Sequence, residues 1–343
     1  MHTYSYESIV MMTPEMIAPR VALAGATGYA GQELLRLLAG HPGVRVTLAM
    51  SSGGEARRLP ALARIWDGDI QPLDVDRLAS DADIACLALP EHASATIGAA
   101  LAAAGTRVVD LSGAFRLRDA ESRRRWYPDS PALPHGTVYG LTEHLRAAIP
   151  SASLVSCPGC YPTAALLALG PLSRANLLTG DVIVDAKSGV SGAGKSPSER
   201  THFSEIHGSL AAYGVFSHRH GAEMEQELGC TVTFVPHLVP INRGILETIY
   251  ARLVPGTRAS QVQDALEAAY SAAPFVRLRG DALPEVKHVA YTNFCDIGWR
   301  VDDASGRLVM VSCIDNLLKG AAGQAVQNLN LMCGFDERMG LLR

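Results

Sequence analysis

The first third of the chain alternates between short apolar runs and segments in which apolar residues recur at helical spacing. The apolar runs are rich in Val, Leu and Ala and are bounded by polar or glycine-containing turns, which is typical of buried strands. The predicted strands are residues 20–24, 44–50, 83–89 and 106–111, and the predicted helices are residues 32–38 and 92–104. Strands and helices that alternate in this way predict βαβ units and a parallel, Rossmann-type sheet, hence an α/β fold class.

Further elements follow in the middle of the chain. The apolar run at residues 164–169 predicts a buried helix that begins near Cys160. Residues 181–185 predict another strand, and residues 221–228 predict a helix with acidic residues in its first turns. With 343 residues, 48% of them hydrophobic and 19% charged, the chain is long enough for two domains with cores of their own.

Charge and cysteine content narrow the class of protein. A net charge of −4 gives no general attraction to nucleic acid or to anionic membranes, and no stretch is long and apolar enough to span a bilayer. Seven scattered cysteines do not resemble a secreted disulfide framework, so we expect a cytoplasmic protein. Residues 1–19 contain Glu7 and Glu15 and no basic region before an apolar core, so we expect a tail and not a signal peptide.

A glycine-rich turn joins the first predicted strand to the first predicted helix. In the segment GATGYAG, Gly25 permits a tight turn, Gly28 lets the backbone approach a pyrophosphate, and Gly31 lets the helix pack close to the strand. The N-terminus of the helix then faces the phosphates. We expect this segment, including Thr27 and Tyr29, to bind a dinucleotide, although an ordinary tight turn has a similar pattern.

The end of the second predicted strand bears on the choice of dinucleotide. An acidic residue there would bind a ribose 2′-hydroxyl, whereas this chain has Ser51, Ser52 and Arg57, which suit a 2′-phosphate. We therefore expect NADP(H) as the cofactor. Glu55 argues against this assignment, and Arg57 in the role of a plain surface charge is the alternative.

Loops at the carboxyl ends of parallel strands line the ligand crevice of such folds. Pro90 and Ser112 lie in two of these loops, and Arg116 follows in the second. A planar guanidinium suits a phosphate or a carboxylate, but a structural ion pair would explain Arg116 equally well.

Cys160 is the first candidate for a nucleophile. It lies where a loop becomes a helix, and the positive end of a helix dipole favours a thiolate. The alternative is a small buried residue, as most free cysteines are. Cys157 completes a C-x-x-C pair, but no second such pair or His pair supplies further zinc ligands, so we expect no metal.

His218 and His220, just before the helix at 221–228, are the candidate acid–base residues, and a helix-capping histidine is the alternative.

Residues 189–196 match the phosphate-loop pattern G-x-x-x-x-G-K-[ST] letter for letter, with Lys195 as the lysine. The polar stretch that follows lacks the helical periodicity which an ATP- or GTP-binding fold needs. We therefore regard nucleotide hydrolysis as the weaker hypothesis.

Together these motifs resemble those of the N-acetyl-γ-glutamyl-phosphate reductase family, over residues 20 to 335 and in the family's order. The matching segments are residues 25–31, 110–116, 138–141, 158–164, 187–195, 212–215, 218–220, 236–244 and 316–324. The resemblance implies an NADPH-dependent reduction of an acyl phosphate to N-acetylglutamate 5-semialdehyde, in arginine biosynthesis. Cys160 would form a thioester, and His220, or otherwise His218, would transfer the proton.

The resemblance also implies further roles and a domain plan. It adds Pro90, Ser188, Gly189, Gly192 and Asn316 to the cofactor site, and Ser112, Arg116, Lys187 and Arg243 to the substrate site. It implies a Rossmann-type NADP domain at 20–160, completed by a C-terminal helix at 315–343, and an α+β catalytic domain of the glyceraldehyde-3-phosphate and semialdehyde dehydrogenase type at 161–314. The chain would form a homodimer or homotetramer.

Two alternatives to this function stay open. A related branch of the family reduces a carrier-protein-linked aminoadipyl phosphate in lysine biosynthesis, and the residues do not separate the two substrates. A protein that binds NADP without catalysis would keep the fold, but retention of both Cys160 and His220 argues against it.

Overall fold

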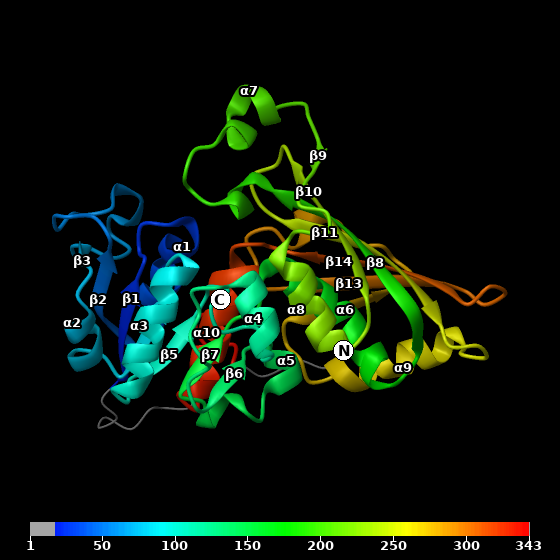
Figure 1. Ribbon diagram of the computed structural model, residues 1–343, viewed down its shortest axis with the longest axis horizontal. Helices are drawn as coiled ribbons and strands as arrows, with labels where there is room; N and C mark the ends of the chain where they lie inside the picture. Colours follow the sequence, from blue (N-terminus) through cyan, green and yellow to red (C-terminus); the bar gives the residue numbers. More distant parts are fainter. Residues whose placement is uncertain (1–17, 343) are drawn as a thin grey trace, which may run out of the picture.

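The computed structural model describes residues 18–342 and contains two units built on separate sheets (Figure 1). Residues 1–17, most of the predicted tail, lie outside the described residues. The first sheet has the strand order β3-β2-β1-β4-β5-β7-β6, and all of its paired strands are parallel. Its strands are β1 (Arg20–Ala24), β2 (Arg45–Ser51), β3 (Gln71–Pro72), β4 (Ile84–Leu87), β5 (Arg107–Asp110), β6 (Thr137–Tyr139) and β7 (Leu154–Ser156). The predicted parallel, Rossmann-type sheet is therefore confirmed.

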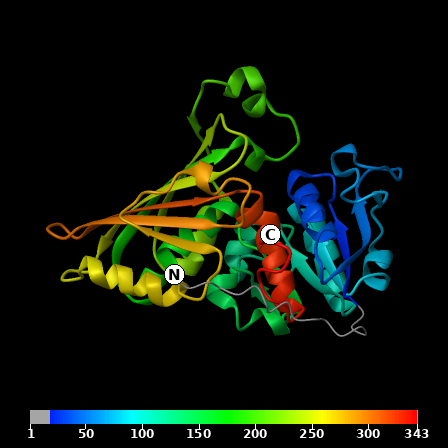
Figure 2. The ribbon, with the colours of Figure 1, turned by 180° about the vertical axis from the view of Figure 1, so that it is seen from behind.

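Helices cover both faces of this sheet. They are α1 (Tyr29–Ala39), α2 (Val75–Ser80), α3 (Glu91–Ala103) and, from the C-terminus, α10 (Gly323–Met332). Ala325, Val326 and Leu329 of α10 lie in one apolar cluster with β1 and α1, so the end of the chain completes the first unit (Figure 2). The predicted helix at 315–343 is too long: a π-helical turn (Leu318–Ala322) precedes α10, and Gly334, with φ of 74°, follows its end.

The second sheet is mixed, with the order β12-β13-β14-β11-β8-β10-β9. Its strands are β8 (Leu178–Gly189), β9 (Ala211–Ala212), β10 (Val232–Val239), β11 (Ile245–Leu253), β12 (Val276–Gly280), β13 (Cys295–Asp302) and β14 (Arg307–Ile314). Only the pairs β8–β10 and β12–β13 are parallel. The remaining helices are α4 (Ala120–Trp126), α5 (Thr142–Leu145), α6 (Cys160–Arg174), α7 (Phe203–Ile206), α8 (Arg219–Leu228) and α9 (Ala259–Tyr270).

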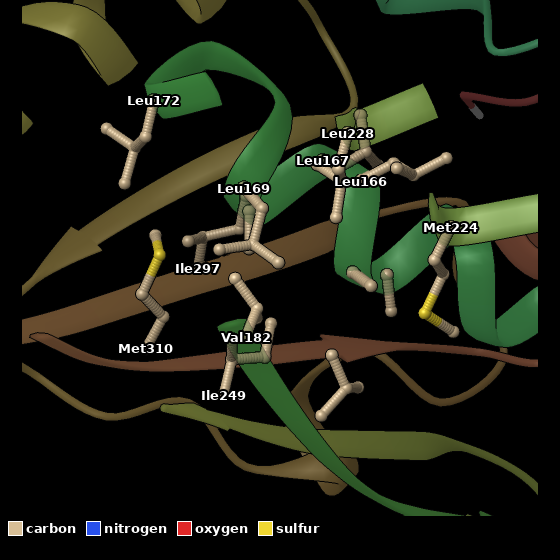
Figure 3. Packing of buried hydrophobic residues seen from close by; sticks show 14 of the residues in the cluster. Leu166, Leu167, Leu169, Leu172, Val182, Met224, Leu228, Ile249, Ile297 and Met310 are labelled. Atoms are coloured by element: carbon tan, nitrogen blue, oxygen red, sulfur yellow. The ribbon is translucent and has the colours of Figure 1, made fainter. Parts of the chain in front are cut away.

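The core of the second unit lies between its sheet and helices α6, α8 and α9. Leu166, Leu167 and Leu169 of α6 pack against inward-facing strand residues such as Ile249 and Ile297 (Figure 3). Strand residues alternate between this face and the opposite one, where Ile183 and Tyr250 are each 43% exposed. None of the helices in residues 18–342 is long and apolar enough to cross a membrane.

Candidate active site at the junction of the two units

The candidate nucleophile lies at the first position of α6, directly after the loop that leaves β7. Gly159 caps this helix without a side-chain acceptor, and Cys160 is half-buried. Burial raises the pKa of Cys160 to about 11, and the nearby guanidinium of Arg116 opposes this rise. A thiol with this pKa is mostly protonated at neutral pH, so a base has to take its proton before the sulfur can act as a nucleophile.

Arg116 lies almost fully buried beside this helix start. Its Nε donates to the carbonyl of Cys157 at 2.8 Å, and its Nη2 donates to the carbonyl of Leu111 at 2.8 Å. Its Nη1 faces both Glu223 Oε2 and His220 Nε2, each at 3.4 Å. Arg116 thus makes the structural ion pair and also faces the candidate acid–base residue.

The two histidines have different surroundings at the start of α8. His218 is the N-cap, and its Nδ1 accepts the backbone N–H of His220 at 3.2 Å. His220 packs against the nucleophile loop, since a Cβ added to Gly159 would lie 2.4 Å from His220 Nε2. Burial lowers the pKa of His218 to about 4 and holds the pKa of His220 well below its usual value, so both rings are neutral at pH 7.

Sequence reasoning missed Glu223, which is fully buried at this site. Its Oε1 accepts the backbone N–H of Gly159 at 2.8 Å and the hydroxyl of Tyr139 at 2.7 Å. Burial raises the pKa of Glu223, and Arg116 opposes the rise. The spacing was a usable signal, because a residue three positions after His220 lies on the same helix face.

The glycine turn of the first unit has the shape that a dinucleotide needs. A Cβ at Gly25, whose φ is 89°, would lie 2.1 Å from the carbonyl oxygen of Ala88, and a Cβ at Gly31 would lie 2.1 Å from that of Gly25. Gly28 caps α1 without a side-chain acceptor, and no acid lies in the first turn of α1. The N–H groups of Gly25, Ala26 and Gly28 are bonded to backbone carbonyls. Those of the first three residues of α1, 29–31, have no partner among the described residues, so phosphate oxygens can accept from them and the segment fits a dinucleotide. Thr27 and Tyr29 lie in the same turn, and Pro90 caps α3 nearby.

Ser51 and Arg57 come together at the end of β2. A Cβ on Gly53 would lie 3.5 Å from Arg57 Nη2 and 3.7 Å from Ser51 Oγ. Ser52, next to them, is exposed. The buried hydroxyl of Ser51 and the exposed guanidinium of Arg57 thus both lie near Gly53.

The loop that follows β8 is hydrogen-bonded to Asn316, which lies just after β14. Buried Asn316 accepts the backbone N–H of Gly244 at 2.7 Å and donates to Ser191 Oγ at 3.0 Å. Ser188 is buried against Gly192, and Gly192 lines a cavity of about 310 Å³ with Arg116, His218, His220 and Arg219. Gly189, at the end of β8, packs against the backbone of residue 242.

Three predicted substrate residues are held by other groups. Lys187 projects from the face of β8 opposite Ala186 and Ser188, and its Nζ pairs with Asp185 at 2.6 Å. The structure therefore does not bring Lys187 into the site, because strand alternation points it away. Arg243 pairs with Asp315 at 2.9 Å and with Glu33 at 3.2 Å, and Ser112 donates to Asp110 at 2.7 Å. The contacts of Arg243 and Ser112 with substrate stay predictions.

The structure gives no support to a phosphate-loop nucleotide hydrolase or to a paired role for Cys157 and Cys160. No α-helix follows Lys195 directly, only a 3₁₀ turn (Glu199–Thr201) and the four-residue α7, so the phosphate-loop fold is absent from this part of the chain. Cys157 is buried in the core of the first unit, with Sγ 3.6 Å from Asn328 Nδ2. Residues 18–342 hold no cluster of three or more His, Cys, Asp or Glu side chains placed for a metal ion.

Comparisons with known proteins identify the family of each unit. Residues 20–152 match the family described as semialdehyde dehydrogenase, NAD binding domain, and residues 160–316 match semialdehyde dehydrogenase, dimerisation domain. The chain is 44% identical over 336 residues to the N-acetyl-gamma-glutamyl-phosphate reductase of Desulforapulum autotrophicum, covering 94% of this chain and 97% of the relative. It is also 44% identical over 337 residues to that of Brevibacillus brevis, with the same coverage. Its fold is similar to that of aspartate semialdehyde dehydrogenase II from Vibrio cholerae, with a TM-score of 0.72 at 20% identity over 93% of this chain and 99% of that one.

Proposed function

The chain belongs to the N-acetyl-gamma-glutamyl-phosphate reductase family, and from this premise we propose that it reduces N-acetyl-γ-glutamyl phosphate to N-acetylglutamate 5-semialdehyde in arginine biosynthesis. The observation that carries the proposal is the convergence of Cys160, Arg116 and neutral His220 at the start of α6. A thiol, a base and a cation are the groups that acyl transfer from a phosphate requires.

Each residue has a chemical task that follows from its surroundings. Neutral His220 can take the proton of Cys160, which allows the sulfur to attack the acyl carbon. The carbon–oxygen bond to phosphate then breaks, inorganic phosphate leaves with the electron pair, and a thioester remains on Cys160. Arg116 stabilises the negative charge of the departing phosphate from its buried position.

The second half of the reaction uses the same groups. NADPH, when bound, supplies a hydride to the thioester carbonyl. Backbone N–H groups at the start of α6 can stabilise the resulting oxyanion. When the carbon–sulfur bond breaks, the aldehyde leaves, and Cys160 recovers its proton from His220.

The cofactor and the assembly are further parts of the proposal. The positions of Ser51 and Arg57 on either side of Gly53 support NADPH in preference to NADH. The match to a dimerisation domain and the apolar outer face of the second sheet, with Ile183 and Tyr250, support a homodimer. The seven free cysteines support a reducing cytoplasm.

The reverse reaction tests this proposal. Purified protein should reduce NADP⁺ with N-acetylglutamate 5-semialdehyde only when inorganic phosphate is present, and Cys160→Ala should abolish the activity. N-acetylaminoadipate and aspartate semialdehydes serve as competing substrates. Preference for the aminoadipate compound would assign the protein to lysine biosynthesis, and inactivity on all three by a folded protein would refute the proposal.

A further inference from the structure

The phosphate-loop pattern at residues 189–196 lacks a helix of its own but lies beside the helix of another unit. Strand β8 ends at Gly189, a 3₁₀ turn (Val190–Ala193) follows, and Gly194 reverses the chain with φ of 85°. This reversal directs Lys195 toward the first unit. Its Nζ donates to the carbonyl of Thr27 at 3.3 Å, within the dinucleotide turn.

Lys195 is distinguished from the other lysines by its lack of a counter-charge. Lys187, Lys287 and Lys319 each have a carboxylate 2.6 Å from Nζ. In the part of the chain that the structure describes, Lys195 has no carboxylate within 4.0 Å, and its hydrogen bond is to a neutral carbonyl. Because no carboxylate pairs with it, the ammonium of Lys195 can bind an anionic ligand.

The surroundings of Lys195 favour an anion as well. It lines a cavity of about 370 Å³ with Tyr29, the first residue of α1, and with Ser196 and Thr201. Glu33, the first acid along α1, is already paired with Arg36 and Arg243. The uncapped N-terminus of α1 and the unpaired ammonium therefore approach one place from two different units.

We propose that Lys195 is the cation for the pyrophosphate of the nicotinamide cofactor, held between the N–H groups of α1 in the first unit and this ammonium from the second. The inference rests on the proposed function, since it takes the cofactor to bind at the turn of residues 25–31. Phosphate oxygens replace the carbonyl of Thr27 as the partner of Lys195. The lysine of the phosphate-loop pattern thus serves the dinucleotide of the neighbouring domain.

Cofactor binding without substrate tests this assignment. Dissociation constants for NADPH, NADH and 2′-AMP are measured by calorimetry on wild type, Lys195→Ala, Lys195→Arg and the control Lys287→Ala. We expect Lys195→Ala to weaken NADPH and NADH by the same factor, about tenfold, as for the loss of one charged hydrogen bond. The dissociation constant of 2′-AMP, which lacks the pyrophosphate, should not change in Lys195→Ala. Lys195→Arg and Lys287→Ala should bind all three ligands like wild type. Arg57→Ala should instead weaken NADPH and 2′-AMP but not NADH.

Three results would overturn the assignment. Unchanged binding of both dinucleotides in Lys195→Ala, or a loss confined to NADPH and 2′-AMP, would remove Lys195 from the pyrophosphate. A normal dinucleotide affinity with a raised KM for inorganic phosphate in the reverse reaction would place Lys195 on the substrate instead. Failure of the proposed function would differ from all three, because wild type would then bind NADPH but reduce no acyl phosphate.

Discussion

Glu223 accepts the backbone N–H of Gly159 at 2.8 Å, one residue before the candidate nucleophile. The same carboxylate faces Arg116 Nη1 at 3.4 Å, so a single buried acid holds both the nucleophile loop and the cation of the site. The geometry of the active site therefore depends on α8, which belongs to the second unit.

We predict that Glu223→Gln lowers kcat by on the order of a hundredfold, because the loop before Cys160 and the guanidinium of Arg116 both shift. Leaving Arg116 without its counter-charge should also lower the free energy of unfolding by about 3 kcal/mol. Steady-state kinetics and urea denaturation measure the two effects. Glu227→Gln is the matched control, since Glu227 of the same helix pairs with the half-exposed Arg118 and should matter little. Equal kinetics for the two variants would contradict the positioning role of Glu223.

Gly320 is the contact between the C-terminal π-helical turn and the nucleophile. A Cβ on Gly320 would lie only 2.8 Å from Cys160 Cβ. We predict that Gly320→Ala displaces Cys160 and lowers kcat by on the order of a hundredfold, with about 1–3 kcal/mol of destabilisation from overpacking. The comparison is Gly221→Ala in α8, whose Cβ would meet only Phe234 at 4.0 Å and should keep wild-type activity. Full activity in Gly320→Ala would show that the contact does not position the thiol.

We predict that the reactivity of the Cys160 thiol rises with pH. Because burial raises its pKa to about 11, the thiolate fraction should grow tenfold for each pH unit between pH 7 and pH 10. Alkylation by iodoacetamide, followed by mass spectrometry, should accelerate in the same proportion. Arg116→Ala should react more slowly at every pH in this range, since its guanidinium lowers the pKa of the thiol. A rate that levels off near pH 8 would show a lowered pKa instead.

Glu247 on β11 is fully buried, and both of its carboxyl oxygens lack a hydrogen-bond partner among the described residues. Burial raises the pKa of Glu247 well above its usual value. The unfolded chain releases this proton near pH 4.3, whereas the folded protein keeps it, so the folded state loses stability as pH rises above that value. We predict that Glu247→Gln becomes more stable relative to wild type between pH 5 and pH 8. Thermal denaturation checks this, with the exposed Glu267→Gln as control, and a pH-independent difference would contradict the buried neutral acid.

Local patterns were sufficient to predict four of the seven strands of the first sheet, helices α1 and α3, and the helix start at Cys160. The strand at residues 20–24 is β1 to the residue, and Cys160 begins α6 as expected, because strand, turn and helix each depend on neighbours in sequence. The mixed second sheet was not predicted beyond the strand within β8. Its strands pair across long separations, for example Glu247 with Ala186 and with Ser312, and no local pattern encodes such pairing.

The site was predictable in its residue types but not in its contacts. Glu223 belongs to a run of acids that resembles a solvated helix face, and only the packing of α8 against Arg116 buries it. The resemblance placed Arg243 in the substrate site, but Glu33 and Asp315, 210 and 72 residues away, pair with it. The outward direction of Lys187 could have been predicted, because the strand alternation around Ala186 and Ser188 is visible in the sequence.

The proposed mechanism passes the acyl group through a thioester on Cys160, and this thioester can be trapped. Wild-type protein is mixed with N-acetyl-γ-glutamyl phosphate in the absence of NADPH, quenched in acid and analysed by intact-mass and peptide mass spectrometry. We expect an added N-acetylglutamyl group on the peptide that contains Cys160, no adduct in Cys160→Ala, and release of the adduct as semialdehyde when NADPH is added before quenching. An adduct at another residue, or reductase activity retained by Cys160→Ala, would contradict it.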